Sequence, residues 1–145
     1  MADPVVTGRC YCGASRLSAD AAALTVAWCH CCDCRRWTGA PQPAFAAFAP
    51  ETLHLAPDTL RPFEAVAGVA RWTCPTCGSP LAARFDYLPG QVWVPLGVLD
   101  QAETLVPASH SHADAALPWL HLDDGLPRSG GSGRDRLNAE LDPDG

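Results

Sequence analysis

The chain contains no lysine: all 10 of its basic residues are arginine, 16 residues are acidic, and the formal net charge is −6. Nucleic-acid binding and peripheral membrane binding both require clustered cations, so this balance argues against either partner. The sequence also lacks an apolar run near the ~20 residues that a membrane-spanning helix needs. The acidic start, Met1–Pro4, has neither the basic region nor the apolar core of a secretion signal. These absences predict a soluble, cytoplasmic protein.

Long helical patterns are missing as well. The 145 residues suit one domain, and 14 prolines with short, interrupted apolar stretches favour strands over helices. We therefore expect a mainly β fold with short helical turns, one of them at residues 33–39 and ended by Gly39. The expected strands are residues 4–9, 15–19, 24–29, 43–49, 52–55, 60–65, 69–73, 81–85 and 91–95.

The composition changes at Arg128, where Gly and Ser are followed by acidic residues with little apolar content. Such a segment buries too little apolar surface to offset the entropy of ordering it. We therefore predict a domain over residues 1–127 and a flexible tail over residues 128–145. Residues 134–141 are compatible with a brief helix.

Cysteine, by contrast, is abundant and clustered. The eight residues form a C-x-C pair, a C-x-C-x-x-C run with one extra cysteine, and a C-x-x-C pair, at positions 10, 12, 29, 31, 32, 34, 74 and 77. In a reducing compartment such local pairs indicate a metal site rather than disulfides. Thiolate ligands suit zinc or iron–sulfur clusters, and the usual ferredoxin spacings are absent, which favours zinc.

Seven of the cysteines divide into a set of four and a set of three. The two outer pairs, each followed by glycine, can close a four-thiolate structural site from Cys10, Cys12, Cys74 and Cys77. The middle run supplies three ligands at one place, Cys29, Cys31 and Cys34. Three ligands with one open position are typical of catalytic zinc. Cys32 is left over, and it could replace Cys31 as a ligand.

Two zinc ions on seven thiolates would add a net charge of −3, which nearby cations must offset. Arginines do stand next to the clusters, at Arg9, Arg35, Arg36 and Arg71.

Three motifs resemble the glutathione-dependent formaldehyde-activating enzyme family, which shares its domain with centromere protein V. They are Gly8–Gly13 (GRCYCG), Cys29–Arg35 (CHCCDCR) and Thr73–Leu81 (TCPTCGSPL), followed by Leu96–Asp100 (LGVLD), His110 and the stretch Pro118–Pro127. The resemblance covers about residues 5 to 128. It implies a β-tent fold with one structural zinc on the outer cysteine pairs and a second zinc on the middle three cysteines.

The resemblance also implies an activity: a carbon–sulfur lyase that, in reverse, joins glutathione to formaldehyde. We extend this expectation to a small thiol and a small aldehyde. Arg35 or Arg36 is the candidate for binding a substrate carboxylate. His30 is a candidate proton shuttle, or, as we favour, a hydrogen-bond donor behind the metal ligands.

Two other functions were weighed. A non-catalytic β-tent zinc module that binds a protein partner is the alternative, and a fourth ligand from Cys32 or a histidine would support it. A zinc-bearing methionine sulfoxide reductase needs a separate nucleophilic cysteine, and no cysteine follows Cys77.

Overall fold

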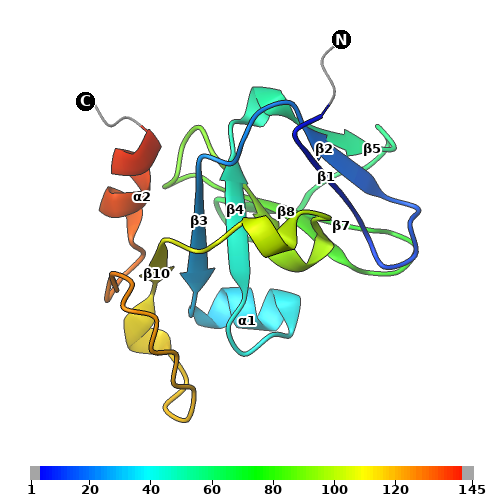
Figure 1. The fold of residues 1–145 in the computed structure, drawn as a ribbon. Coiled ribbons are helices and arrows are strands. Elements are labelled where there is room, and N and C mark those ends of the chain that lie inside the picture. Colours follow the sequence, from blue (N-terminus) through cyan, green and yellow to red (C-terminus); the bar gives the residue numbers. More distant parts are fainter. Residues whose placement is uncertain (1–3, 142–145) are drawn as a thin grey trace.

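The computed structural model describes residues 4–141 and is mainly β, as the sequence predicts (Figure 1). The smaller sheet has three antiparallel strands in the order β1-β2-β5. Its strands are β1 (Val6–Arg9), β2 (Arg16–Ala19) and β5 (Leu53–Ala56).

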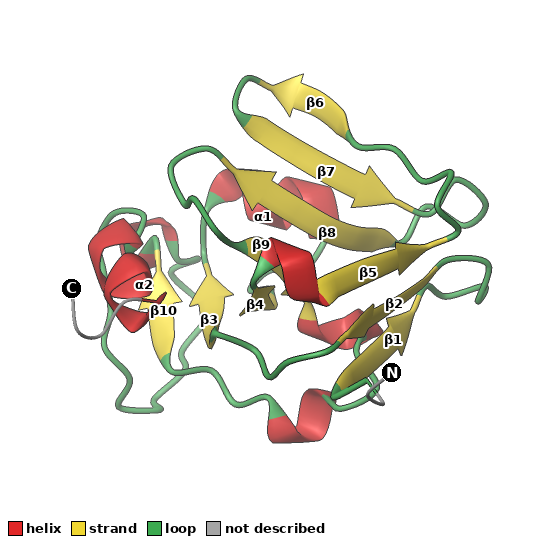
Figure 2. Ribbon diagram, turned by 90° about the horizontal axis from the view of Figure 1, so that it is seen from above, coloured by secondary structure: helices red, strands yellow, loops and turns green. Residues whose placement is uncertain are grey.

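The larger sheet has seven strands in the order β10-β3-β4-β9-β8-β7-β6 (Figure 2). Every pairing in it is antiparallel except that of β10 with β3. The strands are β3 (Thr25–Cys29), β4 (Ala44–Phe48), β6 (Phe63–Val66), β7 (Val69–Thr73), β8 (Pro80–Phe85), β9 (Val92–Pro95) and β10 (Ser109–Ser111). The sequence analysis did not anticipate β10, whose three polar residues carry no strand signal.

Helices are few and short. α1 (Cys32–Thr38) begins at Cys31 and ends at Gly39, which has the left-handed φ of 75° expected of a helix-terminating glycine. The second helix is α2 (Arg134–Leu141), and single helical turns lie at Pro50–Thr52, Leu96–Val98, Ala102–Thr104 and Ala113–Ala115. Among the described residues, neither helix has the length and apolar content to cross a bilayer.

The two sheets meet where β1 passes the segment after β9. A side chain at Gly8 would collide with the carbonyl oxygen of Val98, so only glycine allows this approach. Next to Gly8, Thr7 bonds to two residues that follow Val98. Its hydroxyl donates to Asp100 at 2.7 Å, and its amide donates to the Gln101 side chain at 2.9 Å. This contact gives the LGVLD motif a structural role.

Side chains alternate between the two faces along each strand, and the central strands of the larger sheet are buried on both faces. On β4, Ala46 and Phe48 pack between the two sheets, while Phe45 and Ala47 face the opposite side. The side-chain cluster on that opposite face also contains Trp93, Leu88 and Cys34. It is the face on which the middle cysteines lie.

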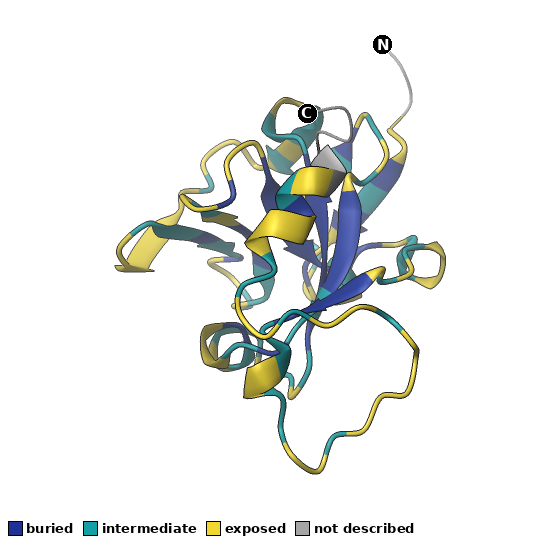
Figure 3. Ribbon diagram, turned by 90° about the vertical axis from the view of Figure 1, so that its left-hand side faces the viewer, coloured by how far each residue is buried: buried dark blue, intermediate teal, exposed yellow. Residues whose placement is uncertain are grey.

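The C-terminal segment differs from the expected tail. α2 lies beside β10 and β3 (Figures 1 and 2), and Leu137 is only 3% exposed, packed with Ala27 and Trp93. Figure 3 shows the exposed face of α2 pointing outward over buried strands. The expectation that residues 128–145 bury too little apolar surface to become ordered is not met at Leu137, while residues 142–145 of the expected tail lie outside the described residues. The domain boundary at residue 127 stays a prediction.

Leu137→Ala is expected to lower the free energy of unfolding by about 2 kcal/mol, because it removes buried methyl groups and leaves a cavity. For a chain of this size the melting temperature would fall by about 5 °C in a thermal unfolding scan. Leu122→Ala is the matched control, since Leu122 is 37% exposed, and it should leave the melting temperature within about 1 °C. Equal melting temperatures for the two variants would show that α2 does not dock.

Candidate functional site

The outer cysteine pairs lie in two turns of similar design, one from each sheet. Cys10 and Cys12 stand between β1 and β2, and Cys74 and Cys77 between β7 and β8. In both turns the first cysteine's amide donates to a serine carbonyl five residues later, Cys10 to Ser15 at 3.0 Å and Cys74 to Ser79 at 2.9 Å. Each turn also contains a glycine with a φ near 80°, Gly13 or Gly78.

The four sulfur atoms of these turns all lie within 4.8 Å of one another. Cys10 Sγ is 3.6 Å from Cys12 Sγ, which is 3.9 Å from Cys74 Sγ. A tetrahedron with zinc–sulfur bonds of about 2.3 Å has sulfur–sulfur edges of about 3.8 Å. The separations therefore fit a tetrahedral metal site formed jointly by the two sheets.

Hydrogen bonds lower the pKa of two of these cysteines, Cys74 and Cys77, toward the thiolate form that binds metal, whereas burial and the neighbouring thiols raise the pKa of Cys12 to about 11. The amides of Ser15 and Ala14 point at Cys10 Sγ and Cys12 Sγ, at 3.3 and 3.4 Å. The Ser79 hydroxyl, 3.1 Å from Cys77 Sγ, lowers the pKa of Cys77 to about 5, and a hydrogen bond from the Ser15 side chain lowers the pKa of Cys74 to about 7.

The middle cysteines gather where β3 ends and α1 begins. Cys29 is the last residue of β3, Cys31 caps α1, and Cys34 lies in its first turn. Cys31 Sγ accepts from the Cys34 amide at 3.2 Å, and the sulfurs of Cys29 and Cys34 are 3.2 Å apart. Hydrogen bonds from Cys29 and then Cys34 lower the pKa of Cys31 to about 2, and hydrogen bonds with Cys29 and then Cys31 raise that of Cys34.

The middle cluster has three potential ligands and no fourth. Within the described residues, no other cysteine, histidine or carboxylate joins Cys29, Cys31 and Cys34 within 4.8 Å. Cys32 is exposed and stays outside the group. The structure thus groups Cys31, not Cys32, with its neighbours, and the donor set of three sulfurs suits a thiophilic metal with one open position.

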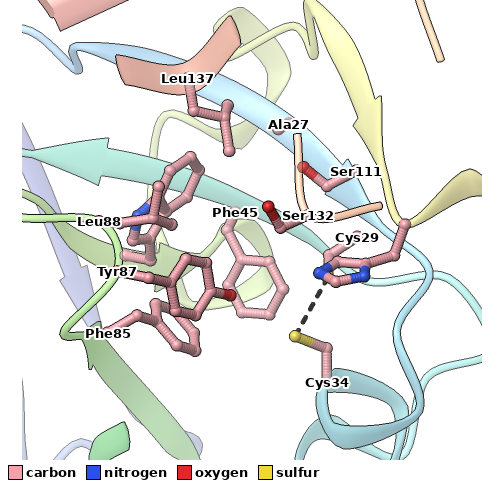
Figure 4. A pocket seen from close by; sticks show the side chains of 12 residues that line it. Ala27, Cys29, Cys34, Phe45, Phe85, Tyr87, Leu88, Ser111, Ser132 and Leu137 are labelled. Atoms are coloured by element: carbon pink, nitrogen blue, oxygen red, sulfur yellow. Dashed lines mark hydrogen bonds between the residues drawn. The ribbon is translucent and has the colours of Figure 1, made fainter. Parts of the chain in front are cut away.

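Two spaces adjoin this cluster. The first is a partly open cavity of about 40 Å³ bordered by Cys29 and Cys34 on one side and by apolar side chains on the other, among them Phe45, Leu88 and Leu137 (Figure 4). Its lining is mostly apolar, and it is much the smaller of the two spaces.

The second space is a groove of about 810 Å³ on the Cys31 side of the cluster, lined by residues that include Cys31, Val69, Arg71, Asp86, His112 and Arg134. Phe85, Tyr87, His112 and Ser132 line both the cavity and the groove. The three sulfurs therefore stand between a small apolar cavity and a much larger groove whose lining also includes charged side chains.

The structure places His30 and Arg35 away from both spaces. His30 is 5% exposed, and its Nε2 lies 2.9 Å from Nδ1 of His110, whose Nε2 lies 2.8 Å from Asp124. With Asp124 ionised and His110 neutral, His110 Nε2–H donates to Asp124 and His110 Nδ1 accepts from His30 Nε2–H. Arg35 donates to the Ala115 carbonyl at 2.9 Å. The roles suggested for His30 and Arg35 stay predictions, and neither residue lines the cavity or the groove.

Sequence reasoning missed the side chains that line the two spaces. His112 was not among the candidate residues, yet it lines both spaces and holds a left-handed φ of 54°, unusual for a residue other than glycine. Tyr87 borders both spaces, and burial raises its pKa to about 12. Ser132 and Leu137 were placed in the tail. None of these residues lies in a motif with the cysteines.

Comparison with known proteins agrees with the motifs. The sequence model of the family described as glutathione-dependent formaldehyde-activating enzyme matches residues 5–115. Because that match covers more than half of the chain, the protein belongs to this family. The matched region includes all eight cysteines and ends before α2.

No curated protein matches the chain. Among solved structures, the crystal structure of a Rhodobacter sphaeroides protein superposes with a TM-score of 0.52 at 20% identity, covering 85% of this chain and 99% of that one. At this identity the likeness shows a shared fold.

Proposed function

We propose that the protein is a zinc-dependent carbon–sulfur lyase that joins a small thiol to a small aldehyde and catalyses the reverse cleavage. The observation that carries this proposal is the position of the three-cysteine cluster between two spaces of different size and polarity. Family membership supports the reaction class. We place a structural zinc on Cys10, Cys12, Cys74 and Cys77 and a second zinc on Cys29, Cys31 and Cys34.

Each of the two spaces is assigned to one substrate. The small cavity, with its mainly apolar lining, suits formaldehyde or a slightly larger aldehyde. The groove beside Cys31 has room for the body of a larger thiol. Holding both reactants against the same cluster makes the addition effectively unimolecular.

In the forward reaction a carbon–sulfur bond forms while the carbonyl π bond breaks, and the thiol proton ends on the former carbonyl oxygen. A bound zinc ion would supply positive charge that favours the substrate thiolate and polarises the carbonyl. His112 lines both spaces and is placed to carry the proton. The product is a hemithioacetal, with no oxidant or reductant involved.

The alternative is a zinc module that binds a protein partner without catalysis. A closed fourth position would favour it, but Cys32 is exposed and His30 Nε2 is paired with His110 Nδ1 at 2.9 Å. The open side of the cluster therefore supports the enzyme.

The test is the rate at which formaldehyde and glutathione exchange with S-hydroxymethylglutathione, measured by NMR exchange spectroscopy on protein with two zinc ions per chain. We expect exchange above the uncatalysed background that scales with protein concentration. Background rates with several thiols and aldehydes, on fully loaded protein, would favour the binding module instead.

A further inference from the structure

Arg71 is a buried cation without a counterion. It lies on β7, is 8% exposed, and its guanidinium is stacked 4.5 Å from the Trp37 ring centre and 5.5 Å from that of Phe85. None of the ion pairs within the described part of the chain includes it. Buried charges are normally paired, because an unpaired buried charge destabilises the folded state.

Two hydrogen-bond donors in this stack also lack acceptors. Arg71 Nη1 and Trp37 Nε1 are both buried and have no partner among the described residues. Buried donors are nearly always satisfied, and an unsatisfied one destabilises the fold. The stack is thus short of an acceptor, and a negatively charged one would also neutralise the guanidinium.

Arg71 lines the same groove as Cys31, so this unmatched charge faces the space assigned to the thiol. Two carboxylates, Asp33 and Asp86, also line the groove, but both are exposed and therefore well solvated. Arg71 is sequestered between aromatic rings, so a carboxylate would gain more from pairing with it than with a solvated surface arginine.

We propose that Arg71 binds a carboxylate of the thiol substrate, and that the enzyme thereby selects acidic thiols over neutral ones. This inference rests on the proposed function and gives the thiol its chemical class. Arginine suits the task because its planar fork matches the two carboxylate oxygens. The assignment moves the carboxylate contact from Arg35, which is bonded to Ala115, to a residue distant in the sequence.

A competing explanation is that Arg71 only offsets the charge of the neighbouring thiolates. Removing Arg71 would then change the binding of every thiol to the same extent, and it would also change the zinc content. A carboxylate contact would instead affect only ligands that carry one. Matched pairs of ligands separate the two explanations.

Binding is measured first, because it needs no catalysis. The probe is 3-(methylthio)propionate, a thioether carboxylate that cannot react, and its neutral match is 2-(methylthio)ethanol; both are titrated into zinc-loaded full-length protein and followed by NMR. We expect the wild type to bind the carboxylate at least about tenfold more tightly than the alcohol, and Arg71→Gln to abolish that preference. Arg71→Lys keeps the positive charge but lacks the planar guanidinium, so it should show an intermediate preference for the carboxylate. This variant provides the test if Arg71→Gln does not fold.

Kinetics then compare 3-mercaptopropionate with 2-mercaptoethanol. In Arg71→Gln, KM for the acid should rise at least about tenfold, while kcat for both thiols and KM for the alcohol stay close to wild type. Equal changes for both ligands, or an unchanged preference for the acid, would overturn the inference. Selective probe binding without any catalysed exchange would refute the proposed activity and leave the carboxylate site standing.

Discussion

Cys74→Ser is expected to unfold the protein or make it insoluble. Cys74 and Cys77 belong to the larger sheet, whereas Cys10 and Cys12 belong to the smaller one, so a metal bound by all four cysteines ties the sheets together. Binding of structural zinc is worth about 10–16 kcal/mol in small domains, as much as or more than the whole stability of an ordinary one. Losing one ligand should lower the melting temperature by more than about 10 °C, seen by circular dichroism, and remove one zinc per chain.

Cys32→Ser is the matched control, since it makes the same chemical change at an exposed cysteine outside both clusters. It should leave the melting temperature and zinc content unchanged. Cys31→Ser should also keep the fold, because its cluster joins β3 to the adjoining α1 and no distant parts of the chain. If Cys31→Ser damaged the fold more than Cys74→Ser, the division into a structural and a catalytic site would be wrong.

The second large effect concerns activity. Cys31→Ser or Cys34→Ser should reduce the catalysed exchange of glutathione and formaldehyde by on the order of 100-fold or more, because a site left with two thiolates holds its metal weakly. Zinc content should fall from two ions per chain to one while the circular dichroism spectrum is retained. The loss should appear in kcat, since the cluster acts on the reacting atoms.

Cys32→Ser again serves as the control and should retain most of the activity. Activity that survived Cys34→Ser but not Cys32→Ser would mean that Cys32 takes part in the ligand set. Loss of zinc with undiminished exchange would show that the reaction does not use the middle cluster.

Local spacing was informative about the cysteine clusters for a physical reason. The turns holding Cys10 with Cys12 and Cys74 with Cys77 place two sulfurs near each other through a few backbone dihedrals and a glycine. The three-cysteine run works in the same way, with Cys31 capping the helix that carries Cys34. The mainly β fold likewise follows from short apolar stretches interrupted by proline and glycine.

Contacts across the fold could not be predicted in this way. Arg71 and Trp37 lie 34 positions apart and meet because the packed elements bring β7 beside α1, and no local pattern marks either residue as a partner. Leu137 looked like an isolated apolar residue in a polar tail, yet the cluster of Ala27 and Trp93 accepts it. The sequence alone therefore divided the cysteines into the outer four and the middle run, whereas the structure brought Cys31, not Cys32, together with Cys29 and Cys34. The tertiary structure decided what surrounds them, because burial and unpaired charge exist only once distant segments pack together.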